Sequence, residues 1–321
     1  MKSFLKRVLV FGLMFFAINY IFDFFYSMPN RKAIAKGTHK IANKWKDMHD
    51  GQEKYDILIL GSSRSFTGYN PKIIDSVLGG NSYNMGTPSQ DIAETYYVLK
   101  EILCYQKPKV ILLDNFIESL DRNINYYPIL SNASFMECDG NKYGLIIKGF
   151  GVEGLANEIT PILKYKYHLK NDLTNLFKGK GKSVSEDENS WYKGFEINST
   201  IITPKEVMSL GPIPNLTTTN VDKTKFEYYC SKIYQLAEEN NAKLIALRTP
   251  YPPHRMEISR GDDVHDYYAE FYKSKNVVFI DFNYTAEPVI KNEDFSDFHH
   301  LNIFGANKVT RELCKLIAPY F

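Results

Sequence analysis

Short apolar runs alternate with longer amphipathic stretches along most of this 321-residue chain. Five of the runs have the length and composition of buried parallel strands, and they occupy residues 55–60, 82–85, 109–113, 243–247 and 276–281. Helical spacing of apolar positions predicts helices over residues 70–79, 88–105, 223–240, 262–274 and 302–317. Strands that alternate with helices in this way predict a parallel sheet with helices on both faces. We therefore expect an α/β domain.

The N-terminus follows a different pattern. Three basic residues precede an uncharged run over 8–22, and apolar character then extends, with one aspartate, to the end of the stretch 8–28. A membrane-spanning helix needs about 20 mostly apolar residues, and basic residues before it favour a cytoplasmic N-terminus. Bulky residues occupy 18–22, where a signal peptide would carry its small-residue cleavage site. We therefore expect residues 1–28 to be a cytoplasmic tip and a retained single-pass anchor in the cell membrane, with the rest of the chain outside the cytoplasm.

Two further segments interrupt the α/β rhythm. Residues 29–54 are polar and compatible with a helix, so we expect a stalk between the anchor and the outer domain. Residues 117–221 contain helical pieces, a charged loop rich in glycine, lysine and serine, and turns rich in proline and threonine. We expect this second segment to be a mainly helical and irregular insertion. The α/β domain would then consist of residues 55–116 and 222–321.

Composition and cysteine spacing exclude some classes of function. A formal net charge of +2 is too small to argue for nucleic-acid binding. The four cysteines are widely separated and form no CxxC pair, so neither a zinc site nor a thiol-redox site is supported. Cys104 and Cys314 lie in amphipathic helical patterns and are expected to be buried free thiols. We expect no cofactor and no metal.

Two segments near opposite ends of the predicted domain carry the candidate chemistry. The first predicted strand runs into Gly61-Ser62-Ser63, and Asp297-x-x-His300 stands just before the last predicted helix. A carboxylate bonded to one ring nitrogen of a histidine fixes the tautomer that accepts a proton from serine. Ser63 is the preferred nucleophile, His300 the base and Asp297 the residue that orients the base.

Alternatives exist for both segments. Ser62 is a close alternative nucleophile, and Ser65 is a weaker one, because all three serines follow the same strand. His299 is the alternative base, but Ser296, three positions earlier, cannot orient it as a carboxylate would. The glycine-serine segment alone is also consistent with a strand-to-helix turn with a capping serine. The histidine pair alone is consistent with a polar helix start.

Other candidate site residues also lie at or after strand ends. The carboxyl ends of parallel strands meet at one edge of a sheet, where ligands bind. Gly86 and Asn115 each follow a predicted strand, and we expect them to be oxyanion donors together with the Ser63 backbone N–H. Weaker candidates for binding an anionic substrate are Arg64, His254 and Arg255.

The order of these motifs along the chain resembles that of the SGNH hydrolase superfamily, whose four sequence blocks supply Ser, Gly, Asn and His. The matching segments here are Gly61-Ser62-Ser63, Gly86, Asn115 and Asp297-x-x-His300. The resemblance implies a flavodoxin-like three-layer α/β/α sandwich with a Ser-His-Asp triad for ester hydrolysis or acyl transfer. It covers about residues 55–116 and 243–321. Two departures are Ser62, where the family has aspartate, and Leu113-Asp-Asn-Phe, where it has Gly-x-Asn-Asp.

A narrower group is also similar. It shares Gly-Ser-Ser, a single N-terminal anchor and the run from His300 to Gly305, and it includes the D protein of lipoteichoic-acid D-alanylation and the SGNH-like proteins of polysaccharide O-acetylation. This resemblance implies an extracytoplasmic acyl esterase or O-acyltransferase that acts on an acylated cell-envelope polysaccharide or teichoic-acid-like polymer, beside a multispanning membrane-bound O-acyltransferase. The alternatives are a non-catalytic accessory protein of such a complex, or a lipase or esterase of the secreted type.

Overall fold

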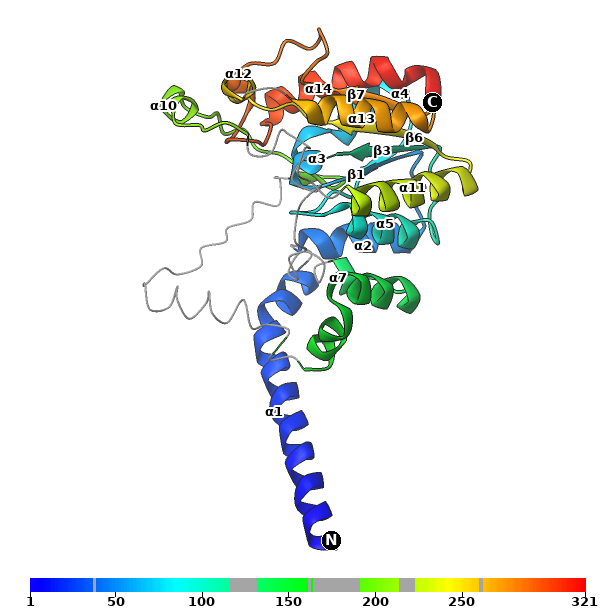
Figure 1. The fold of residues 1–321 in the computed structure, drawn as a ribbon, viewed down its shortest axis with the longest axis vertical. Helices are drawn as coiled ribbons and strands as arrows, with labels where there is room; N and C mark the ends of the chain where they lie inside the picture. Colours follow the sequence, from blue (N-terminus) through cyan, green and yellow to red (C-terminus); the bar gives the residue numbers. More distant parts are fainter. Residues whose placement is uncertain (37–38, 116–131, 161–162, 164–190, 214–222, 260–261) are drawn as a thin grey trace.

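The computed structural model describes residues 1–36, 39–115, 132–160, 163, 191–213, 223–259 and 262–321. A long N-terminal helix projects from an α/β domain (Figure 1). The sheet of this domain has the strand order β2-β1-β3-β6-β7, and all of its pairs are parallel. Its strands are β1 (Ile57–Leu60), β2 (Ser82–Asn84), β3 (Val110–Asp114), β6 (Lys243–Arg248) and β7 (Val278–Asp281). This is the flavodoxin-like order, so the predicted fold class is confirmed.

Helices cover both faces of the sheet, and strand side chains alternate between two hydrophobic cores. In β1, Leu58 and Leu60 belong to one core, whereas Ile57 and Ile59 belong to the other. The first core is covered by α2 (Lys40–Asp50), α5 (Ile92–Ile102), α11 (Thr224–Glu239) and α13 (Asp263–Ser274). The second is covered by α4 (Pro71–Leu78) and α14 (Ile303–Ile317), which is followed by the short η4 (Ala318–Tyr320).

Local capping sets where the helices begin and end. The Asn70 side chain accepts a hydrogen bond from the Lys72 N–H at the start of α4, and Gly79 ends that helix with φ +71°. The helix predicted over 88–105 begins instead at Ile92. The Asp91 carboxylate caps it by accepting from the Glu94 N–H, so the preceding residues form a turn.

Helix α2 lies within the segment expected to be a stalk. Trp45 and Met48 are buried in the first core, and the Trp45 Nε1–H donates to Asn132 Oδ1 at 3.0 Å. The range 29–54 therefore contains a helix that packs as part of the α/β domain.

The described residues of the expected insertion also contact the domain. The hairpin of β4 (Trp191–Tyr192) and β5 (Phe195–Glu196) meets the edge strand β2, where the Asn84 N–H donates to the Lys193 carbonyl at 3.0 Å. A Cβ at Gly194, whose φ is +80°, would lie 1.8 Å from the Asn84 carbonyl oxygen, so only glycine permits this approach. The other helices here are α7 (Asp139–Ile159), which bends at Gly151, and α10 (Pro204–Met208). The charged loop rich in glycine, lysine and serine, which spans residues 178–189 of the expected insertion, lies outside the described residues.

Helix α1 (Lys2–Ala35) contains the stretch Lys2–Phe25, whose most apolar 18-residue window has a mean hydropathy of 2.0. It is long and apolar enough to cross a membrane, and only 6% of the most apolar window is buried against the rest of the protein. A membrane anchor and a signal sequence both have this character.

All four cysteines are free thiols. Cys314 is buried as predicted, but Cys104 is exposed because it follows the last turn of α5 instead of facing the core.

Replacing Trp45 with alanine tests whether α2 is part of the folded domain. We expect Trp45→Ala to lower the free energy of unfolding by about 3–5 kcal/mol, because it removes a buried ring and leaves Asn132 without its donor. Chemical denaturation of the detergent-solubilised chain measures this change. Lys46→Ala, at an exposed position on the same helix, is the matched control and should have little effect. Equal stabilities of the two variants would show that α2 does not contribute to the core.

Candidate active site

Ser63 is the first residue of α3 (Ser63–Gly68), two positions after a glycine turn that ends β1. Gly61 has φ +147°, and a Cβ there would lie 3.0 Å from both the Asp114 and the Ser65 Cβ atoms. The tight turn thus requires glycine and brings β1 close to the end of β3. Ser63 is half-buried at this edge of the sheet.

The alternative serines have other roles. Ser62 is 1% exposed and caps α3 by accepting a hydrogen bond from the Arg64 N–H. Ser65 is fully buried and donates to Asn84 Oδ1 at 3.3 Å. Of the three serines, only Ser63 is both partly accessible and bonded to a histidine.

A continuous line of hydrogen bonds joins Ser63, His300 and Asp297. Ser63 Oγ lies 2.8 Å from His300 Nε2, and His300 Nδ1 lies 2.7 Å from Asp297 Oδ2. An ionised carboxylate only accepts, so Nδ1 carries the proton and Nε2 accepts from the Ser63 hydroxyl. The structure thus brings together the three residues predicted as nucleophile, base and orienting carboxylate.

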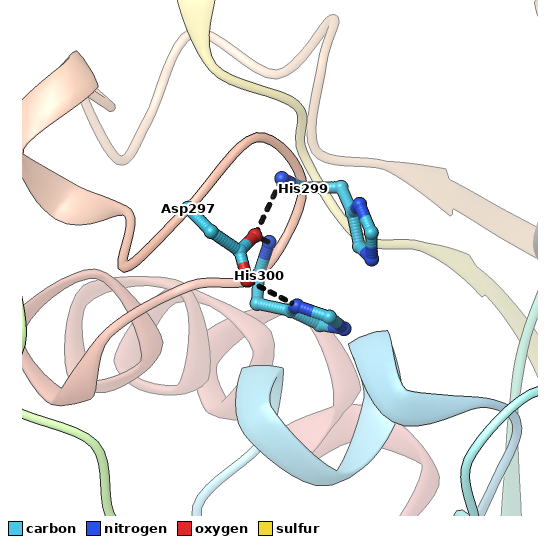
Figure 2. A group of neighbouring side chains, drawn as sticks. All are labelled: Asp297, His299 and His300. Carbon is cyan, nitrogen blue, oxygen red and sulfur yellow. Dashed lines mark hydrogen bonds and ion pairs between the residues drawn. The ribbon is translucent and has the colours of Figure 1, made fainter. Parts of the chain in front are cut away.

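The Asp297 carboxylate also shapes the loop that carries the histidine. Asp297 Oδ1 accepts from the His299 and His300 backbone N–H groups at 2.8 and 2.9 Å (Figure 2). The loop is closed by the Ser296 N–H, which donates to the His300 carbonyl at 2.9 Å. Asn302 then starts α14 by accepting from the Phe304 N–H. Residues 297–300 therefore supply the base, the carboxylate that orients it, and most of the hydrogen bonds that hold this loop in place.

The surroundings of the histidine loop lower the pKa values of both Asp297 and His299. Partial burial acts to raise the pKa of Asp297, but hydrogen bonds from the His300 ring and from two backbone N–H groups outweigh it and hold this pKa well below its usual range. Burial, followed by the charges of His300 and Arg64, lowers the pKa of His299 to about 3. Asp297 is therefore ionised and His299 neutral near neutral pH.

Arg255 belongs to α12 (Pro253–Ile258), is 8% exposed and supports the histidine loop from behind. Its guanidinium donates to the Phe298 carbonyl at 2.8 Å and to the carbonyls of Gly211 and Pro212. Backbone carbonyls engage Arg255 in this geometry, and the expectation that it binds substrate stays a prediction. This arginine clamps the loop that carries His300 onto α12.

Arg64 has a similar structural role. It is 1% exposed, donates to the carbonyls of Thr249 and Pro250, and lies 3.6 Å from the centroid of the Tyr251 ring. Burial and these partners hold it against the loop after β6, and the expectation that it binds an anionic substrate stays a prediction. His254, the third weak candidate, is half-buried, and its backbone N–H donates to Asn292 Oδ1, next to the short helix η3 (Asn292–Asp294).

Gly86 and Asn115, two of the three expected oxyanion donors, bond other groups in this geometry. The Asn115 side-chain amide donates to the Leu113 and Leu247 carbonyls and its oxygen accepts from the Tyr272 hydroxyl, so the side chain points into the first core. The Gly86 N–H donates to Asn84 Oδ1 at 3.1 Å. Both residues lie after strand ends as expected, and a role as oxyanion donors, which would require these bonds to break, stays a prediction.

A lysine that the sequence places in the stalk lies beside the site instead. Lys44 of α2 is 4% exposed, and its ammonium donates to the Gly86 carbonyl and lies 5.2 Å from the Phe66 ring of α3. Burial is the main reason that its pKa falls to about 7. Lys44 therefore links α2 to the β2 turn and to the helix that begins with Ser63.

Asp297, His299 and His300 each offer a metal-ligand atom, and these atoms lie within 4.8 Å of one another. In this geometry both Asp297 oxygens already accept hydrogen bonds and His300 Nε2 faces Ser63. A metal ion bound here would have to displace these bonds, so the arrangement fits proton transfer better than coordination.

Comparisons with known proteins give the following likenesses. A protein-family model matches residues 216–321, which include Asp297 and His300 but not Ser63. The sequence matches none of the curated proteins. Three similar solved structures are a protein from Desulfitobacterium hafniense described as lipolytic and of the G-D-S-L family, a GDSL-like lipase from Bacteroides thetaiotaomicron, and a protein from Bacteroides fragilis described as an acylhydrolase.

The sequence identities to these three are 12%, 10% and 9%, and the TM-scores are 0.40, 0.41 and 0.40. The alignments cover 81%, 87% and 86% of this chain and 98%, 98% and 96% of the respective structures. Likeness of this degree does not transfer an activity. The function therefore has to be argued from the geometry of the site.

Replacing Asn115 separates a structural role from an oxyanion role. We expect Asn115→Ala to lower the free energy of unfolding by about 1–3 kcal/mol, because it removes the buried hydrogen bonds of the Asn115 side chain to the Tyr272 hydroxyl and to the Leu113 and Leu247 carbonyls. The rate of covalent modification of Ser63 per folded molecule should stay unchanged. A loss of that rate without a loss of stability would return Asn115 to the catalytic site.

Proposed function

We propose that this protein is a serine esterase or acyltransferase that forms an acyl-enzyme on Ser63. The observation that carries the proposal is the line of hydrogen bonds from Ser63 Oγ through His300 to Asp297, at 2.8 and 2.7 Å. Such a line is the arrangement by which an imidazole activates a serine hydroxyl, and it recurs on unrelated folds.

The proposed reaction begins when Ser63 Oγ attacks the carbonyl carbon of an acyl ester while its proton passes to His300 Nε2. Asp297 stabilises the resulting imidazolium through the bond to Nδ1. When the tetrahedral intermediate collapses, the bond to the leaving alcohol breaks and His300 returns the proton to that oxygen. Water, or a hydroxyl of an acceptor, then attacks the acyl-enzyme by the same steps in reverse, which gives hydrolysis or transfer.

The start of α3 supplies a donor for the oxyanion. Within the described residues the Ser63 backbone N–H makes no hydrogen bond, as expected for the first residue of a helix. It lies on the same residue as the attacking oxygen, so it is close to the negative charge that forms.

We further propose that the domain acts outside the cytoplasm on an acylated cell-envelope polysaccharide or teichoic-acid-like polymer. Helix α1 supports the location, because it is long and apolar enough to anchor the chain. The resemblance of Gly61-Ser62-Ser63 and the His300–Gly305 run to acyl-handling envelope proteins supports the polymer class and a multispanning O-acyltransferase as partner.

A second candidate is a non-catalytic accessory protein of such a membrane complex. The observation that favours it is the engagement of Gly86 and Asn115 by other groups, which removes two of the three expected oxyanion donors. A lipase of the secreted type is a third candidate, and a dependence of rate on acyl-chain length would identify it.

Covalent labelling tests the nucleophile. A fluorophosphonate should modify the wild-type chain by forming a phosphorus–oxygen bond to Ser63 with release of fluoride. Ser63→Ala should abolish labelling, and His300→Ala should slow it by about 10²- to 10⁴-fold, because proton transfer to the base is lost. Ser62→Ala is the matched control and should retain labelling, since that side chain only caps α3.

The labelling rates are measured by intact-protein mass spectrometry on folded, detergent-solubilised chain. A folded wild type that is never labelled would favour the accessory-protein candidate. Labelling that persists in Ser63→Ala would move the nucleophile to another serine.

The exposed thiol of Cys104 tests the location of the domain. A membrane-impermeant maleimide should label intact cells, and Cys104→Ala should remove most of the signal, because Cys230 and Cys314 are buried and Cys138 is only partly exposed. Burial and the charge of Glu101 raise the pKa of Cys104, so labelling should be faster at mildly alkaline pH, where more thiolate is present. Labelling that requires cell lysis would place the domain in the cytoplasm.

A further inference from the structure

One described donor is not enough for the oxyanion of a typical acyl transfer, which is held by two or more preorganised groups. In this chain Asn115 and the Gly86 N–H are bonded elsewhere, and the Ser63 N–H remains. A second donor would have to lie beside Ser63 and His300, keep a proton near neutral pH, and lack another partner.

The side chain of His299 meets the geometric requirement. Its ring lies against the His300 ring with the two centroids 3.9 Å apart, and His300 Nε2 bonds Ser63 Oγ at 2.8 Å. Figure 2 shows both rings on the same side of the loop, with the His300 ring also bonded to the Asp297 carboxylate through Nδ1. The His299 ring also contacts the Phe298 ring in a T-shaped arrangement, with centroids 4.0 Å apart, which limits its rotation.

The hydrogen bonds of His299 leave its ring available. Its backbone N–H donates to Asp297 Oδ1, but within the described part of the chain neither ring nitrogen has a hydrogen-bond partner. The side chain is half-buried, so one ring edge can reach a ligand at Ser63.

The charge state of His299 also suits a donor. Burial, His300 and Arg64 lower its pKa to about 3, so the ring is a neutral imidazole with one N–H near neutral pH. A neutral imidazole donates a hydrogen bond without acting as an acid, and enzymes use such a group to polarise a substrate carbonyl.

We propose that the His299 ring N–H is the second oxyanion donor of the site and stabilises the negative oxygen of the tetrahedral intermediate formed on Ser63. No proton is transferred from His299; it donates a hydrogen bond while the proton of Ser63 passes to His300 and then to the leaving oxygen. This inference rests on the acyl-enzyme function proposed above.

The test compares His299→Ala, His299→Gln and His265→Ala in the full-length, detergent-solubilised chain. The hydrolysis of a nitrophenyl ester and the binding of an aryl boronic acid, which forms a tetrahedral adduct with serine, are both measured. His299→Ala should lower kcat about 10²- to 10³-fold with little change in KM, because the lost bond exists only in the transition state. It should weaken boronate binding by a similar factor.

The other two variants are the controls. His299→Gln keeps an N–H donor and should recover part of both losses. His265 is another half-buried histidine, but it bonds Asp281 at the end of β7, three strands from β1, so its replacement should change neither value. The backbone bond from residue 299 to Asp297 persists in every variant, so the histidine loop keeps its anchor.

Several outcomes would overturn the proposal. Unchanged kcat and boronate affinity in His299→Ala would show that the ring donates nothing to the oxyanion. An equal loss in His299→Gln, or a shift of the pH profile without a loss at its plateau, would show that His299 acts only by packing against His300. Absence of any labelling of wild-type Ser63 is a different result, because it removes the acyl-enzyme function itself.

Discussion

The site depends on one carboxylate that accepts three hydrogen bonds within four residues of chain. Asp297 bonds the His300 ring through one oxygen and the backbone N–H groups of residues 299 and 300 through the other. These bonds fix the position and the tautomer of the imidazole at the same time. Everything else in the neighbourhood brings this small, locally closed loop to the serine at the end of β1.

Two parts of the fold bring the histidine loop to Ser63. In the strand order, β2 lies on one side of β1 and β3 lies on the other. Ligands bind at such a switch point, at the carboxyl ends of the strands, and Ser63 lies there at the start of α3. The loop before α14 is then held at that edge by Arg255, whose three nitrogens bond carbonyls of this loop and of residues 211–212. Arg64 and Arg255, both buried, therefore hold backbone carbonyls next to the site.

The sequence was a good guide to the sheet and to the three residues of the hydrogen-bonded line. Short apolar runs predict buried strands reliably, and Asp297-x-x-His300 is a local motif whose geometry depends on few distant residues. Asn115 could not be judged in this way, because alternation along a strand decides which face its side chain takes, and Asp114 beside it takes the other. Lys44 looks solvated in a polar helical stretch, although Trp45 and Met48, three residues apart, indicate that α2 has a buried face.

The packing of α2 has a mechanical consequence for a chain anchored through α1. Only residues 36–39 separate the two helices, and four residues reach at most about 14 Å even when fully extended. A linker of four residues allows the α/β domain to move only a short distance from the end of α1. With α1 in a membrane, as proposed, this short linker would keep the α/β domain and its serine close to the lipid surface, and substrates would have to meet the site there.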